Sequence, residues 1–168
     1  MKIVSQQECQ DWLTARLAME FSREAMKGVY PHSVTYQLPS DTGKKTILGR
    51  VLAGSLDTTQ PGLFWVTAWG IFPSSENMLL FDGYRKSLGE SRSIYSAPGH
   101  IFVESDLQKV ECLLDLALYF YWDASLFDGA GRIVVSMSHD ECFSVYAKDK
   151  AQVQDFEGNL ERLKLNQL

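Results

Sequence analysis

The chain has 168 residues, of which 45% are hydrophobic and 22% are charged. A chain this apolar offsets its ordering entropy by burying surface, which excludes extensive disorder, and its length predicts one domain spanning residues 1–168. The formal net charge of −5 argues against general nucleic-acid binding, because phosphate contacts require a basic surface.

The cysteine and hydropathy patterns favour a cytoplasmic protein. Cys9, Cys112 and Cys142 lack the regular spacing of a disulfide framework, so we expect reduced thiols. The N-terminus has no apolar run of signal-peptide length. The most apolar stretch, residues 112–122, is interrupted by Asp115 and is too short to cross a bilayer. We expect no membrane segment and no cofactor.

The first predicted element is a helix over residues 5–26. Ser5 and Glu8 have the spacing of a capping box, in which two backbone amides are satisfied reciprocally. Gly28 is a plausible end of this helix. An apolar stripe at four-residue spacing continues through it: Cys9, Leu13, Leu17 and Phe21.

A predicted β region follows. Residues 34–38, 45–53 and 63–71 are rich in apolar and β-branched side chains and are separated by turn signals at 41–43 and 58–62. Because short turns join antiparallel neighbours, we expect these three runs to form an antiparallel meander.

Two helices are predicted next. The first covers about residues 76–88, with Ser74 or Ser75 after Pro73 as its N-cap. The second begins at Ser105, which has capping-box spacing to Gln108, and its sequence is apolar on most sides up to Phe120. A helix of that kind is typically central and buried.

The last part of the chain predicts three more strands, at 124–127, 132–137 and 142–147, with turns at 128–131 and 138–141 and a helix over 150–165. Strands in hairpin-linked groups favour an α+β fold. We expect a largely antiparallel sheet of about six strands, packed against a central apolar helix and two or three further helices.

The densest group of reactive side chains is the segment 138–141. One hypothesis is a small hydrolase or transferase in which His139 acts as general base with Asp140 or Glu141 beside it. Sequence neighbours rarely face each other, however, and no metal-ligand spacing is present. A polar segment between two alternating strands is typical of a hairpin turn, which we favour.

That catalytic hypothesis requires distant side chains to converge on the turn, for instance His100 or Asp123. His100 precedes a strand-like run at 101–103. Trp122 and Asp123 follow the central helix and are candidate binding residues at a cleft. The alternative is a structural role, because a helix-to-strand corner requires a large buried apolar side chain and a turn-forming residue.

A third candidate site comprises Trp65, Thr67 and Trp69, which alternate along a predicted strand and should share one face of the sheet. If Trp65 and Trp69 are exposed on that face, the protein would be a small-ligand binder that uses these two side chains. If a helix covers the face, the two tryptophans belong to the core, and we favour this second interpretation.

Residues 122–127, followed by 138–141, resemble segments of small bacterial immunity proteins. The resemblance implies a non-enzymatic domain that acts by protein–protein interaction. An acidic domain would be steered toward a basic protein partner, and a homo-oligomer is the alternative assembly.

Overall fold

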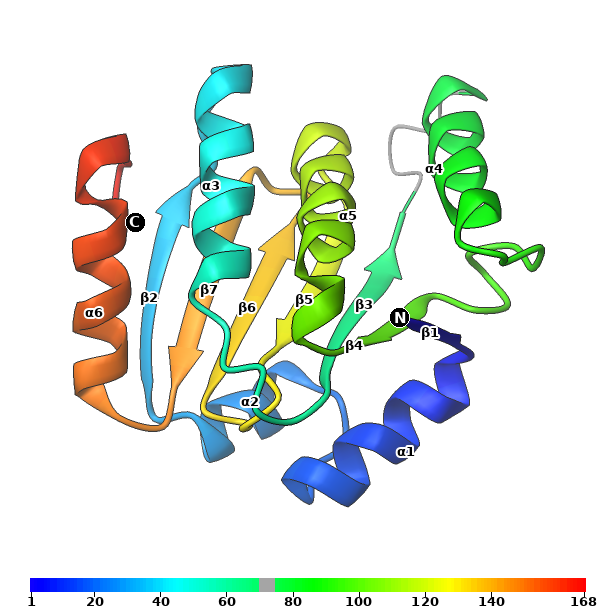
Figure 1. The fold of residues 1–168 in the computed structure, drawn as a ribbon. Coiled ribbons are helices and arrows are strands. Elements are labelled where there is room, and N and C mark those ends of the chain that lie inside the picture. The colour runs from blue at the N-terminus through cyan, green and yellow to red at the C-terminus, as the bar shows by residue number, and fades with distance from the viewer. Residues whose placement is uncertain (70–74) are drawn as a thin grey trace.

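The computed structural model describes residues 1–69 and 75–168. The predicted strand end at Ile71 and the predicted helix start at Pro73 and Ser74 lie outside these residues. Figure 1 shows the arrangement of the helices and strands.

Within the described residues, seven strands form one antiparallel sheet, with the order β1-β4-β3-β5-β6-β7-β2. The strands are β1 (Lys2–Val4), β2 (His32–Gln37), β3 (Gly62–Ala68), β4 (Gly99–Phe102), β5 (Asp123–Phe127), β6 (Ile133–Ser138) and β7 (Cys142–Ala147). The α+β prediction is confirmed, with a slightly larger sheet than expected.

Residues 45–53 were predicted as a strand, and this prediction is wrong, because they belong to helix α3 (Thr42–Gly54). The supposed turn at 41–43 is the start of that helix: the Asp41 carboxylate accepts the Lys44 N–H at 2.8 Å. Leu48 and Leu52, four residues apart, are fully buried on one helix side.

The predicted meander is therefore also wrong. With α3 between them in the chain, β2 and β3 do not pair: β2 is an edge strand beside β7, and β3 lies between β4 and β5.

The predicted N-terminal helix is two helices, α1 (Gln6–Leu17) and α2 (Arg23–Val29). The capping box of Ser5 and Glu8 is confirmed. The chain leaves α1 at Ala18, which adopts the left-handed conformation with φ of 51°. Ser22 then caps α2 through a 3.0 Å bond from the Ala25 N–H, so Phe21 lies between the helices.

The three other predicted helices are present as α4 (Ser75–Ser87), α5 (Leu107–Phe120) and α6 (Lys150–Leu160). Short 3₁₀ turns, Glu104–Asp106 and Glu161–Leu163, precede α5 and follow α6. Asp106, and not the predicted Ser105, is therefore the residue that precedes α5. No described helix is long and apolar enough to cross a bilayer.

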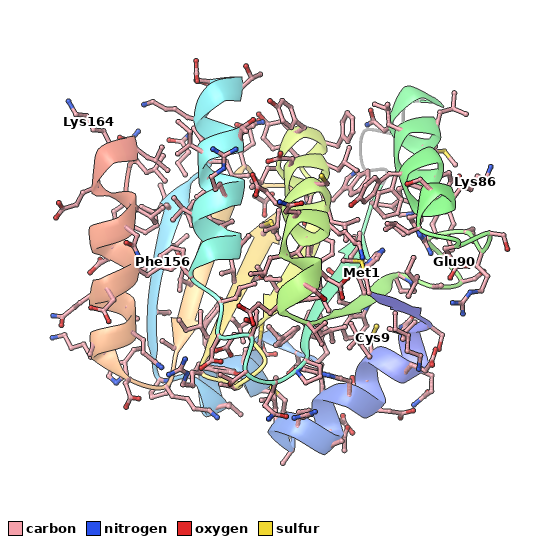
Figure 2. The ribbon with its side chains drawn as sticks, in the orientation of Figure 1. Met1, Cys9, Lys86, Glu90, Phe156 and Lys164 are labelled. Atoms are coloured by element: carbon pink, nitrogen blue, oxygen red, sulfur yellow. The ribbon has the colours of Figure 1, made fainter. Side chains whose placement is uncertain are left out.

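The helices cover the two faces of the sheet unequally. In Figure 1, α3, α5 and α6 stand in front of the sheet, while α1 and α2 lie at its lower end. Figure 2 shows Phe156 on the side of α6 toward the sheet, and it is buried. The front helices bury one face in the larger core, and α1 and α2 contribute to a smaller core on the other face.

Gly99 on β4 gives the first prediction. A Cβ at this position would overlap the Cys9 sulfur of α1 and would lie 2.8 Å from Val4 Cγ2. We expect Gly99→Ala to lower the free energy of unfolding by about 1–3 kcal/mol, because overpacking displaces α1 from the sheet. Gly158→Ala on α6, where a Cβ meets open space, should raise it by about 0.5–1 kcal/mol. Urea denaturation measures both, and equal effects would contradict the packing argument.

Asp115 on α5 gives a pH-dependent prediction. Burial, reinforced by Glu111, raises its pKa to about 6, and among the described residues its Oδ1 atom has no hydrogen-bond partner. The unfolded pKa is about 3.9, so ionisation weakens the fold progressively from about pH 4 to about pH 6.

Asp115→Asn should therefore raise stability by about 1–2 kcal/mol near pH 8 and have little effect near pH 4. Thermal unfolding at both pH values measures this difference. The same neutralisation at exposed Asp155 is the control and should give no pH-dependent gain; a gain from Asp115→Asn that persists at pH 4 would refute the account.

Candidate functional site

The sheet face that α1 and α2 cover is divided into rows by strand register. One row crosses β3, β5, β6 and β7 and is apolar, with Leu63 opposite Phe127, then Val134 and Tyr146. These four side chains are buried in the smaller core together with residues of α1 and α2, such as Cys9 and Met26.

The next row on the same face is rich in hydroxyl groups. It runs from Trp65 through Ser125, Ser136 and Ser144 to Thr35, each opposite the next across β3, β5, β6, β7 and β2. At the β7–β2 end, the hydroxyls of Ser144 and Thr35 are 2.8 Å apart. Hydroxyl groups in the middle of a sheet face are unusual unless they are bonded or face solvent.

A cavity of about 290 Å³ opens over this row, and we call it the hydroxyl pocket. Its lining residues are Phe21, Met26, Thr67, Asp123, Ser125, Ser136, Met137, Ser138, Asp140, Cys142, Ser144 and Tyr146. Ser125 is only 1% exposed, and its hydroxyl makes no hydrogen bond to any residue that the structure describes. A polar group in this state is available to a ligand.

A second cavity, of about 460 Å³, adjoins the first, and we call it the aromatic pocket. It is lined by Gln6, Gln10, Phe21, Trp65, Val66, Thr67, Ala68, Trp69, Ile94, Tyr95 and Pro98. Four of these side chains are aromatic, two carry amides and none is charged. Phe21 and Thr67 line both pockets, so the two cavities are neighbours.

Phe21 is held between the pockets by α1. Its N–H donates to Oε1 of Gln10 at 3.1 Å, and the amide of Gln10 donates to the Met19 carbonyl at 3.2 Å. The Phe21 ring then packs on Trp65, with 4.8 Å between ring centroids. One glutamine side chain thus fixes the position of the aromatic side chain that the two pockets share.

The prediction that Trp65 and Trp69 share a sheet face is wrong. The register between β3 and β5 shifts between Val66 and Ala68, and such an extra residue reverses the alternation. Trp65 therefore packs in the smaller core and Trp69 against the larger one. Both nevertheless line the aromatic pocket.

Trp122, predicted as a cleft residue, lies in the larger core and is 2% exposed. Its ring packs on Trp69, with centroids 5.6 Å apart, and on Phe81, at 5.0 Å. It lines neither of the two pockets. Trp122 thus supports Trp69, which also packs on Phe81, at 6.0 Å, and on the exposed ring of Tyr95, at 5.2 Å.

The segment 138–141 is the turn between β6 and β7, and Glu141 has a positive φ of 59°. Asp123, predicted as a binding residue, holds this turn. Its Oδ1 atom accepts the His139 N–H at 2.7 Å and lies 2.8 Å from His139 Nδ1. These contacts with Asp123 raise the pKa of His139.

The turn offers a weak case for catalysis. Asp123 does converge on His139, but the other ring nitrogen, Nε2, faces Asp140 Oδ1 at 3.6 Å and His139 lines neither pocket. Ser138 Oγ is occupied by Asp140, whose N–H it accepts at 3.2 Å. A general base requires a nucleophile or substrate proton within reach of its free nitrogen. These contacts hold the turn in place, and we call the pair of Asp123 and His139 the latch.

His100 does not take part in this arrangement. It is fully buried on β4 between the rings of Phe64 and Phe81. Burial, with Arg85 nearby, lowers its pKa to about 3, so it is neutral. Within residues 1–69 and 75–168, no group of three or more His, Cys, Asp or Glu side chains is suited to hold a metal ion.

Comparison with known proteins does not extend these findings. No protein-family model matches this chain. Curated proteins and solved structures likewise give no match. The resemblance to immunity proteins therefore stays a prediction.

The latch gives a prediction for NMR. The charge attraction between His139 and Asp123 requires a protonated imidazole, so it is complete below the ordinary histidine pKa of about 6.5 and is lost as the pH rises through the raised pKa of His139. Asp123→Asn should lower the midpoint of the His139 ring titration. Asp140→Asn should lower it less, because Asp140 is the smaller cause. An unchanged midpoint in Asp123→Asn would refute the latch.

Proposed function

We propose that this protein binds a small, hydroxyl-bearing ligand of the sugar class, with a sugar ring in the aromatic pocket. The observation that supports the proposal is the lining itself: aromatic rings and two glutamine amides, with no charged side chain among the lining residues that the structure describes. A volume of about 460 Å³ falls in the range typical of small-molecule sites.

The chemistry of a sugar ring fits this lining. Its C–H bonds carry partial positive charge and pack against the negative face of an aromatic ring. Tyr95 offers such a face, because its side chain is 70% exposed at the pocket. Sugar hydroxyls require donors and acceptors, which the exposed amide of Gln6 supplies.

A protein partner, the leading hypothesis from the sequence, is the second candidate, and it depends on other residues. Helix α4 exposes three consecutive apolar side chains, Met78, Leu79 and Leu80, at 41%, 72% and 57%. Contiguous exposed apolar side chains favour a protein-interaction surface.

Tryptophan fluorescence tests the ligand proposal, because Trp65 and Trp69 line the pocket. Titration with uncharged disaccharides, such as cellobiose, maltose and N,N′-diacetylchitobiose, should give a saturable change with at least one of them. Tyr95→Ala should weaken binding about tenfold, equivalent to about 1.4 kcal/mol. Tyr119→Ala on α5, on the opposite face of the sheet, is the matched control and should leave affinity unchanged.

No saturable response to any of these sugars would count against the proposal. If sedimentation then showed concentration-dependent self-association that Leu79→Glu abolished, the interaction surface on α4 would be the better account.

A further inference from the structure

The hydroxyl pocket differs from the aromatic pocket in charge. The carboxylates of Asp123 and Asp140 both line it, and none of the lining residues that the structure describes is a lysine or arginine. His139 contacts both carboxylates without lining the pocket. Even when protonated, this single imidazolium faces two negative charges, so the group keeps a net negative charge.

The floor of the same pocket supplies hydrogen-bond acceptors. Ser125 and Ser136 face each other across β5 and β6, and both line the pocket. Ser125 is 1% exposed, and no described residue is bonded to its hydroxyl. A bound donor would supply the hydrogen bond that this hydroxyl lacks within the protein.

These two observations select one ligand chemistry. A protonated amine carries a positive charge and three N–H donors, and it has no acceptor. It therefore matches a pocket that combines net negative charge with several oxygen acceptors, and hydrogen bonds between charged groups are about twice as strong as neutral ones. A neutral hydroxyl would gain the hydrogen bonds but not the charge attraction.

We infer that the hydroxyl pocket is the subsite for a protonated amino group of the ligand whose ring occupies the aromatic pocket. The inference rests on the proposed function, and it narrows the ligand from a sugar to an amino sugar with a free amine. The shared lining residues Phe21 and Thr67 place the two subsites next to each other, so one oligosaccharide can reach both.

Two matched disaccharides test the subsite: the glucosamine dimer, with free amines, and N,N′-diacetylchitobiose, the same skeleton with the amines acetylated and uncharged. By tryptophan fluorescence near neutral pH and at low salt, the free-amine form should bind at least about tenfold more tightly. Added salt should reduce this preference, because it screens the charge attraction.

Two variants locate the preference in the hydroxyl pocket. Ser125→Ala and Asp140→Asn should each reduce affinity for the glucosamine dimer while leaving affinity for the diacetyl form unchanged. Ser33→Ala, a serine of β2 that does not line the pocket, is the matched control and should preserve the preference. Thermal unfolding of each variant verifies the fold, which neither substitution should weaken.

The outcomes separate the two proposals. Equal affinity for the two disaccharides would overturn the amine subsite and leave the sugar-binding function intact. A preference that survives both Ser125→Ala and Asp140→Asn would also overturn the subsite. Failure of both disaccharides and of the other uncharged sugars to bind would overturn the sugar-binding function, and the amine subsite with it.

Discussion

The strict alternation of side chains along antiparallel strands is the constraint on which the rest of this structure depends. It places an apolar row and a hydroxyl row side by side on one sheet face, with Phe127 and Ser125 two residues apart on β5. Residues of α1 and α2 pack with the apolar row and with Trp65 in the smaller core. The hydroxyl row is left as the floor of a cavity, and a candidate site thus arises from incomplete helix coverage.

The break between α1 and α2 completes that arrangement. A continuous helix through residue 26, as the apolar stripe predicts, would carry Phe21 on its own surface. The left-handed Ala18 and the second N-cap at Ser22 release Phe21 from the helix, and Gln10 then fixes it over Trp65. The predicted apolar stripe included Phe21, but it could not indicate that the Phe21 ring contacts Trp65.

Local sequence signals predicted most of the helices and strands but few of the contacts between them. The hairpin turns and the capping box at Ser5 were predictable, because they depend on residues within one turn. The helix at 42–54 was mistaken for a strand, although Leu48 and Leu52 have helical spacing and Asp41 is a good N-cap. Which strands pair, and which residue is opposite Ser125, depends on contacts far apart in sequence.

The candidate site was also only partly predictable, because it too depends on contacts between residues far apart in the sequence. Trp65, Trp69 and Asp123 were candidates from the sequence, whereas Tyr95, Gln10 and the serine row were not. Alternation of Ser125 and Ser136 with apolar neighbours was the available signal for the row. The position of Phe21 has a wider consequence, because one of the two side chains shared by the pockets comes from a connecting segment, whereas the other, Thr67, belongs to β3. A smaller side chain at position 21 would widen the passage between the two pockets, so the size of ligand that the protein accepts can change without any change in the strands.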